Sequence, residues 1–317
     1  MSTSRTREKA DKVTFTQAEV TSAVTAGDTA ARAGRKNLIL NGSMQISQRG
    51  AYTSATGLTS SWTYHLDRFK TRINNISGNL THKVDQTVNG KLTDTVRLDA
   101  TSTASGYINL LQQFEDLQKL KGQPVTFSAW VKSNNTNAKL VLHRDGSNAQ
   151  TATTHTGGGG WELLTATVTL ATNITTVGLY CGILANATGN VSITNGDYFE
   201  MAFVQLELGS VATDFEHRSY GEELALCQRY FEVIDSGEIP ENDYYYSSRR
   251  YLNPIQYSVT KRATPAVTVT SQGGWPNGSG GTYSAGGNTT RVSITAISGN
   301  ALNNQLHSYT LHIDAEL

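Results

Sequence analysis

The sequence has little of several features that define common protein classes. Its 317 residues include only two cysteines, Cys181 and Cys227, and five prolines. Two isolated cysteines form neither a metal motif nor a disulfide framework, so we expect buried free thiols. No apolar run approaches the ~18 residues of a membrane span. We therefore predict no metal site, no cofactor and no insertion into a membrane.

Charge is also scarce. Charged residues make up 16% of the chain, against about 25% in typical globular domains. Lys plus Arg and Asp plus Glu both number 26, so the net charge is zero. This balance excludes nucleic-acid binding by a broad basic surface. The 29 glycines and the abundance of Thr, Ser and Asn favour β-sheets with uncharged polar faces and many turns.

Residues 1–36 have a different pattern from the rest of the chain. Thr16 and Glu19 match the two ends of a helical capping box, and Val20 and Val24 follow one turn apart. Because this apolar stripe is thin, it cannot bury much surface alone. We therefore expect the segment to stay mobile or to become ordered against a partner. Its basic residues suit either a solvated end or contact with an acidic partner. If it docks, the residues we expect to take part are Arg5, Arg7, Val20 and Val24.

Residues 37–216 have the pattern of an antiparallel β-sandwich. Apolar residues alternate with polar ones from Val125 to Lys132, which is typical of a strand with one face toward a core. Strands are predicted at about 79–84, 94–98, 107–113, 125–132, 139–144, 161–170, 176–184 and 197–208. So many closely spaced strands favour a sandwich over βαβ units. The stretch NLILNGSMQISQRG (37–50) is predicted as the first strand with a turn at Asn41-Gly42. Its expected core residues are Leu38, Leu40, Met44 and Ile46.

A linking helix and a second, smaller domain are predicted after the sandwich. Ser219 and Glu222 match a capping box, and an apolar face continues through Cys227 to Phe231. We therefore expect a helix over 217–231. Residues 232–317 contain further alternating stretches and a glycine-dense excursion, which predict a β-rich C-terminal domain.

Catalytic motifs are missing from the sequence. There is no G-x-S-x-G elbow and no P-loop, and the spacing of the histidines does not match a zinc site. Glycosidases need two carboxylates about 5 to 10 Å apart, and neighbouring carboxylates such as Glu222 and Glu223 are better explained as the acidic first turn of a helix. We predict that the protein is not an enzyme.

Aromatic residues are the stronger functional signal. Sugars bind by stacking their apolar faces on aromatic rings while their hydroxyls form hydrogen bonds with side chains. The alternatives are core or rim packing for Trp62 and Trp161, and a subunit contact for Trp275. The candidate ligand-binding residues are Trp62, Trp161, Tyr244, Tyr245, Tyr246 and Trp275.

Several segments resemble a group of bacteriophage virion proteins. They are NLILNGSMQISQRG (37–50), YHLDRF (64–69), GQPVTFSAWVKS (122–133), GGGGWELLTATVTL (157–170), VQLELGSVATDFEHRSYGEELALCQRYF (204–231) and the ending HIDAEL. The segment 204–231 is the most specific, and the resemblance extends over roughly 37–317. The central domain is similar to jelly-roll carbohydrate-binding modules of the galactose-binding type.

The resemblance implies a tail fibre or receptor-binding protein on the surface of a phage particle. Such a protein docks to other virion proteins through its N-terminal segment, commonly forms homotrimers, and can bind polysaccharide on the host surface. It is made in the host cytoplasm. The resemblance does not define a ligand or transfer any sugar-binding residue. Two alternatives stay open, a capsid decoration or head-fibre protein without a glycan site and, less favoured, a glycan-cleaving tailspike.

Overall fold

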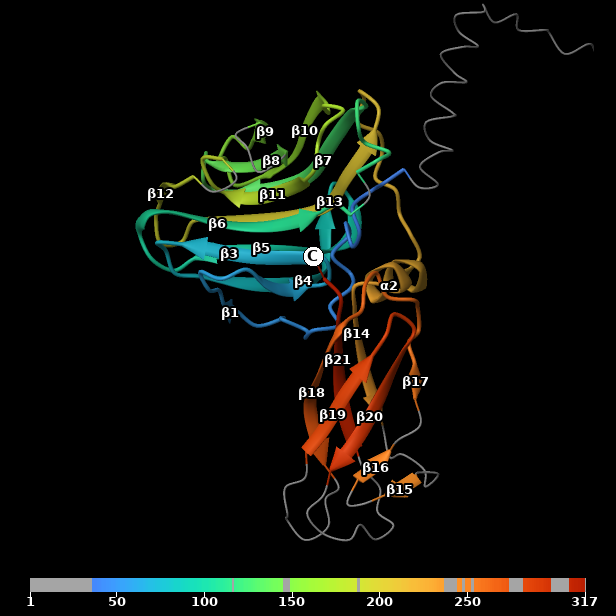
Figure 1. Ribbon diagram of the computed structural model, residues 1–317. Helices are drawn as coiled ribbons and strands as arrows, with labels where there is room; N and C mark the ends of the chain where they lie inside the picture. Colours follow the sequence, from blue (N-terminus) through green and yellow to red (C-terminus); the bar gives the residue numbers. More distant parts are fainter. Residues whose placement is uncertain are drawn as a thin grey trace, which may run out of the picture.

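The computed structural model describes residues 36–115, 117–144, 149–186, 189–236, 244–246, 249–251, 254–273, 282–297 and 308–316. A large β-sandwich occupies one end of the molecule and a smaller β-rich unit the other, and helix α2 (Tyr220–Gln228) lies between them (Figure 1). The predicted docking residues Arg5, Arg7, Val20 and Val24 lie outside the described residues, as does Trp275.

The sandwich consists of two antiparallel sheets in a jelly-roll arrangement. The first sheet has the order β1-β4-β5-β13-β7-β10. Its strands are β1 (Thr56–Gly57), β4 (Gly78–Val88), β5 (Lys91–Ala100), β13 (Tyr198–Leu208), β7 (Pro124–Ser133) and β10 (Trp161–Thr169). The second sheet has the order β2-β3-β6-β11-β8-β9, and β12 (Val191–Ile193) pairs with β6. Its strands are β2 (Thr63–Leu66), β3 (Phe69–Asn74), β6 (Ala104–Gln113), β11 (Val177–Ile183), β8 (Ala138–Arg144) and β9 (Ala149–Thr154).

Alternation along the strands places one core between the two sheets. In β7 the apolar positions Val125, Phe127, Ala129 and Val131 are fully buried, as the sequence pattern predicts. From the other sheet, β11 contributes the free thiol Cys181 among other buried side chains. The second cysteine, Cys227, is also free and buried, and burial raises the pKa of both thiols. The prediction of two buried free thiols is therefore confirmed.

The segment 37–50 departs from the prediction of a first strand. Asn41 and Met44 have left-handed backbone conformations (φ 58° and 61°), so the chain turns instead of running straight. The predicted turn at Asn41-Gly42 is present, because the backbone N–H of Met44 donates to the carbonyl of Asn41 at 2.9 Å. Gly42 also packs closely, since a Cβ there would lie 2.2 Å from the carbonyl oxygen of Val204. Met44 and Ile46 are buried as expected, whereas Leu38 and Leu40 are only half-buried and Ile39 occupies the core instead.

The linking helix is shorter than the predicted 217–231. Ser219 caps it by accepting a hydrogen bond from the backbone N–H of Glu222, and α2 ends at Gln228. Phe231, expected on the helical face, begins strand β14 (Phe231–Ser236). Within the part of the chain that the structure describes, no helix is long and apolar enough to cross a membrane.

The C-terminal unit has a small core of its own. One sheet has the order β14-β21-β18, with β21 (Ser308–Asp314) and β18 (Ala266–Gly273). The other contains β15 (Tyr244–Tyr246), β16 (Arg249–Tyr251), β20 (Arg291–Ile297), β17 (Ile255–Gln256) and β19 (Thr282–Gly287). Its buried cluster is Tyr257, Val292, Leu311 and Ile313. The side chain of Lys261 is fully buried and forms an ion pair with Glu232.

A largely buried ionic network connects the sandwich to this unit, and we call it the joint. It comprises Arg49, Asp67 and Arg68 from the sandwich, Tyr230 and Phe231 after α2, and Asp314 and Glu316 at the end of β21. The guanidinium of Arg49 lies 3.2 Å from Asp67 and 3.4 Å from Asp314, and Arg68 pairs with Glu316. Asp314 and Glu316 therefore help to hold the two units together, at the end of β21 that lies toward the sandwich (Figure 1).

Candidate functional site

The sheet containing β3, β6, β11 and β8 has one face in the core and one facing away from it. Residues that are directly opposite on neighbouring strands share a face. On the outward face, Lys70 is opposite Leu111, Leu111 is opposite Tyr180, and Tyr180 is opposite Val141. One row of side chains therefore crosses four strands, with the aromatic ring of Tyr180 near its centre.

A second row runs beside the first. Arg72 is opposite Asn109, Asn109 is opposite Gly182, and Gly182 is opposite Lys139. The row begins and ends with a half-buried basic side chain, while Asn109 between them is buried. Basic groups therefore lie on both sides of a centre that carries no charge.

Aromatic rings form a continuous strip on this face. Trp62, which directly precedes β2, meets Tyr180 edge to face with ring centroids 6.1 Å apart. Tyr180 meets His143 in the same way at 5.8 Å. The guanidinium of Arg72 lies 5.6 Å from the ring centre of Trp62 and 5.8 Å from that of Tyr107. The basic aromatic face is our name for the half-buried side chains Trp62, Tyr64, Lys70, Arg72, Lys139, His143 and Tyr180, together with the buried Tyr107.

Two glycines leave space along β11 beside Tyr180. Gly178 and Gly182 stand two positions before and after Tyr180 and so share its face. A Cβ on Gly182 would lie 2.1 Å from the carbonyl oxygen of Ile108, so this position requires glycine. Because neither residue has a side chain, β11 itself places nothing over the flanks of the tyrosine ring.

Burial sets the protonation behaviour of this face. It raises the pKa of Tyr180, with the neighbouring Tyr107 adding to the effect, and it also raises the pKa of Tyr64. Both hydroxyls therefore keep their protons at neutral pH and can donate hydrogen bonds. Burial lowers the pKa of Lys70, and the nearby positive charge of Arg68 lowers it further.

These groups together suit a ligand with apolar faces and polar edges. The half-buried rings of Trp62, Tyr180 and His143 offer stacking surface. The phenol hydroxyls and the basic groups around them offer hydrogen bonds at the rim. Binding of this kind needs no general acid or base.

The structure separates the two described tryptophans among the sequence candidates. Trp62 belongs to the basic aromatic face, whereas Trp161 lies at the start of β10 on the outward face of the other sheet. There Trp161 packs with Trp130 and Phe215 around the buried Phe203. The structure therefore does not bring Trp62 and Trp161 into one site.

The remaining candidates lie elsewhere. The backbone of Tyr244–Tyr246 forms β15 in the C-terminal unit, at the end away from the sandwich (Figure 1). Their role in binding stays a prediction, as does that of Trp275, which lies outside the described residues.

Sequence reasoning missed Tyr180, His143, Arg72 and Tyr107. The signal for Tyr180 was present, because it falls out of phase with the apolar run of Leu179 and Cys181 and therefore had to face away from the core. Its meeting with Trp62, more than a hundred positions earlier in the chain, depends on the pairing of β3, β6 and β11. Sequence alone could not supply that pairing.

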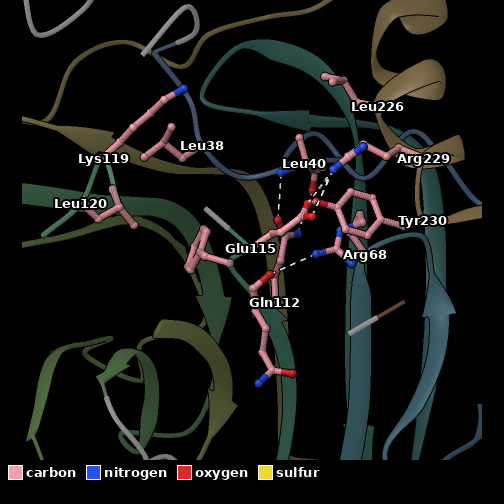
Figure 2. A pocket seen from close by; sticks show the side chains of 12 residues that line it. Leu38, Leu40, Arg68, Gln112, Glu115, Lys119, Leu120, Leu226, Arg229 and Tyr230 are labelled. Atoms are coloured by element: carbon pink, nitrogen blue, oxygen red, sulfur yellow. Dashed lines mark hydrogen bonds and ion pairs between the residues drawn. The ribbon is translucent and has the colours of Figure 1, made fainter. Parts of the chain in front are cut away.

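A separate cavity of about 380 Å³ lies beside the joint (Figure 2). Its lining residues are Leu38, Leu40, Arg68, Gln112, Gln113, Phe114, Glu115, Lys119, Leu120, Leu226, Arg229 and Tyr230. Gln112 exchanges two hydrogen bonds with the backbone of Leu40, at 2.9 and 2.8 Å. Glu115 accepts hydrogen bonds from Arg229 at 3.1 Å and from the hydroxyl of Tyr230 at 2.6 Å. These polar groups satisfy one another, so we take the basic aromatic face as the candidate site.

Comparisons with known proteins give only distant similarities. No known protein family matches the chain and no curated protein sequence matches it. Among solved structures, the chain is similar to the enzymatically active domain of tailspike protein 4 of bacteriophage CBA120, with 13% identity, TM-score 0.36, and coverage of 55% of this chain and 21% of the tailspike chain. The match therefore spans about a fifth of that tailspike chain.

Two carbohydrate-binding proteins are also similar in structure. The module TmCBM61, solved with β-1,4-galactotriose, has 12% identity, TM-score 0.33, and coverage of 55% of this chain and 99% of the module. A family 11 carbohydrate-binding module from Clostridium thermocellum, solved with a β-1,3-1,4-mixed-linked tetrasaccharide, has 15% identity, TM-score 0.29, and coverage of 50% and 99%. The description of this chain as a jelly-roll sandwich rests on its own sheet topology.

Proposed function

We propose that this protein is a non-enzymatic component of a phage particle that binds polysaccharide on the host surface through its basic aromatic face. One observation carries the binding part of the proposal. A strip of half-buried rings, Trp62, Tyr180 and His143, lies on an outward sheet face and is bordered by Arg72 and Lys139. Rings with polar groups at their edges are the recognition chemistry that sugars require.

The phage part of the proposal is supported by the sequence resemblance of residues 37–317. In this proposal residues 1–36 attach the protein to other virion proteins, and copies of the chain associate, with a homotrimer as the expected form. Several copies on one particle convert weak binding to each glycan into strong attachment through avidity.

Binding is tested with purified protein on an array of bacterial surface polysaccharides. We expect saturable binding that falls about tenfold in Tyr180→Ala, because loss of a stacked ring costs on the order of 1 kcal/mol beyond the buried area. A matched variant, Tyr220→Ala, removes an exposed tyrosine at the start of α2 and should bind as the wild type does. Absence of binding to every glycan would refute the proposed function and favour a decoration or head-fibre role.

Attachment and the absence of catalysis need separate measurements. Deletion of residues 1–36 should leave glycan binding intact and abolish incorporation into particles, measured by immunogold labelling. Incubation with bound polysaccharide should release no reducing sugar, and release would instead support a glycan-cleaving spike. Light scattering of the purified protein measures the number of copies in the oligomer.

A further inference from the structure

We propose that the polysaccharide recognised by the basic aromatic face is negatively charged, with carboxylate or phosphate groups along its sugar chain. This inference rests on the proposed function and specifies the class of its ligand. The charges of the face support this inference: its charged side chains are all basic, whereas the net charge of the whole chain is zero.

Arg72 and Lys139 contact only neutral acceptors. The Nε–H of Arg72 donates to the backbone carbonyl of Ser60 at 3.0 Å, and the ammonium group of Lys139 donates to the backbone carbonyl of Ala185 at 3.2 Å. Within the described part of the chain, neither side chain forms an ion pair with a carboxylate. Two positive charges are thus held in place on this face without a neutralising partner.

The outward positions of the sheet offer no acidic group. Among the described residues of β2, β3, β6, β11, β8 and β9 that face outward, none is Asp or Glu. The opposite sheet differs, since Glu200 on its outward face lies 3.2 Å from Lys83 and 3.6 Å from Arg97. Lys83 and Arg97 on that sheet are therefore neutralised within the protein, whereas Arg72 and Lys139 have no carboxylate partner among the described residues.

The two charges lie at opposite ends of one row. Three strand spacings separate Arg72 from Lys139, which is roughly 14 Å across the sheet, and Tyr180 lies in the neighbouring row between them. A polysaccharide lying across the strands can therefore stack a sugar on Tyr180 and place acidic groups at both ends. An arginine fork suits the two oxygens of a carboxylate or phosphate.

The test compares charged polymers with a neutral one, and one charged and neutral pair differs only in its carboxyl groups. The full chain is titrated by calorimetry with polygalacturonate, with the same polymer after its carboxyl groups have been reduced, and with a phosphodiester-linked polysaccharide. At about 0.05 M salt we expect at least one charged polymer to bind about tenfold more tightly than the neutral one, and about 0.5 M salt to remove most of this difference. The two charged polymers distinguish carboxylate from phosphate recognition.

Matched variants show which side chains cause the preference for the charged polymer. Arg72→Gln and Lys139→Gln should each weaken binding of the preferred charged polymer by about three- to tenfold and leave the neutral polymer unaffected. Lys132→Gln, on the outward face of the opposite sheet, should change neither. Thermal melting of each variant shows that it is folded.

The outcomes separate this inference from the proposed function. Equal or tighter binding of the neutral polymer, or charge-dependent binding that survives in both Arg72→Gln and Lys139→Gln, would overturn the inference while leaving glycan binding intact. If no polymer of either kind binds, on the array or in calorimetry, the inference falls together with the proposed function.

Discussion

Arginine side chains lie against aromatic rings in two regions of the molecule, and the two regions differ in whether the arginine is also paired with a carboxylate. At the joint, Arg49 lies 3.5 Å from the ring centre of Phe231 and Arg68 lies 3.6 Å from that of Tyr230, and both also contact carboxylates. On the basic aromatic face, Arg72 lies 5.6 Å from the ring centre of Trp62 with no carboxylate paired to it among the described residues. The arginines of the joint are paired with carboxylates of the chain, whereas Arg72 on the face is not.

The largest expected effect is on stability at the joint. The side chain of Arg68 is 3% exposed, and its partner Glu316 is 4% exposed. Arg68→Ala leaves a buried carboxylate with only the more distant Arg49, at 3.6 Å, so the free energy of unfolding should fall by about 3–5 kcal/mol. Urea denaturation measures this change.

The face supplies the control for this prediction. Arg72→Ala removes the same kind of side chain from a half-buried site without an ion pair, so it should cost at most about 1 kcal/mol. Equal losses of stability in the two variants would mean that the joint and the face do not differ in the way described.

The second prediction concerns pH at the joint. Burial raises the pKa of Asp67 from 3.8 to about 6, although Gln48 and Arg49 act in the opposite direction. Between these two pH values the folded state holds a proton that the unfolded state has released. The free energy of unfolding should therefore fall as the pH rises from about 4 through 6, by on the order of 2–3 kcal/mol from this group.

Asp67→Asn removes this titration. Because other carboxylates also titrate in this range, the quantity to compare is the difference between wild type and variant across the pH series. The variant should gain stability relative to wild type as the pH rises from 4 to 7. Parallel stability curves would show that folding does not raise the pKa of Asp67.

The third prediction concerns the backbone beneath the face. A methyl group at Gly182 would lie 2.1 Å from the carbonyl oxygen of Ile108, so Gly182→Ala must push β11 away from β6. We expect a loss of about 1–3 kcal/mol in the free energy of unfolding. At Gly178 the nearest atom is a flexible methyl group of Leu111, at 2.8 Å, so Gly178→Ala should cost much less. Denaturation of the two variants side by side checks this difference.

Local patterns in the sequence were sufficient for much of the fold. Alternation in β7, the helix cap at Ser219 and the turn at Asn41-Gly42 each depend on neighbouring residues, and each appears in the structure. The predictions failed where contacts between residues far apart in the sequence determine the local structure. Leu38 and Leu40 have the alternation of a core strand. In the structure the side chain of Gln112 instead forms both hydrogen bonds with the backbone of Leu40, so Leu40 pairs with a side chain and not with a neighbouring strand.

For the same physical reason, the residues of the basic aromatic face were harder to find in the sequence than the segments that carry the resemblance. The segments that carry the resemblance contribute Arg49, Asp67, Arg68, Tyr230 and Glu316, and these residues meet at the joint. They specify how the two units are connected. The basic aromatic face is assembled from strands whose outward positions alternate with core residues, so its members share no contiguous motif.

The smallest expected effect is a difference in polysaccharide binding between variants on the two outward faces of the sandwich. Trp62 and Trp161 are both half-buried tryptophans at the start of a strand, and they differ in their surroundings. Trp62 contacts Tyr180 and lies near two cations, whereas Trp161 packs with Trp130 and Phe203. Trp62→Ala should weaken polysaccharide binding by about tenfold, which corresponds to the ~1.4 kcal/mol of a stacked ring.

Trp161→Ala should change binding by less than about twofold and instead lower the free energy of unfolding, because its ring packs against buried neighbours. Affinity electrophoresis in polysaccharide gels and urea denaturation measure the two quantities on the same samples. If Trp161→Ala weakened binding and Trp62→Ala did not, the ligand would lie on the opposite sheet. The aromatic strip beside Arg72 and Lys139 would then be a structural feature of the sandwich, and the contrast between joint and face would concern stability alone.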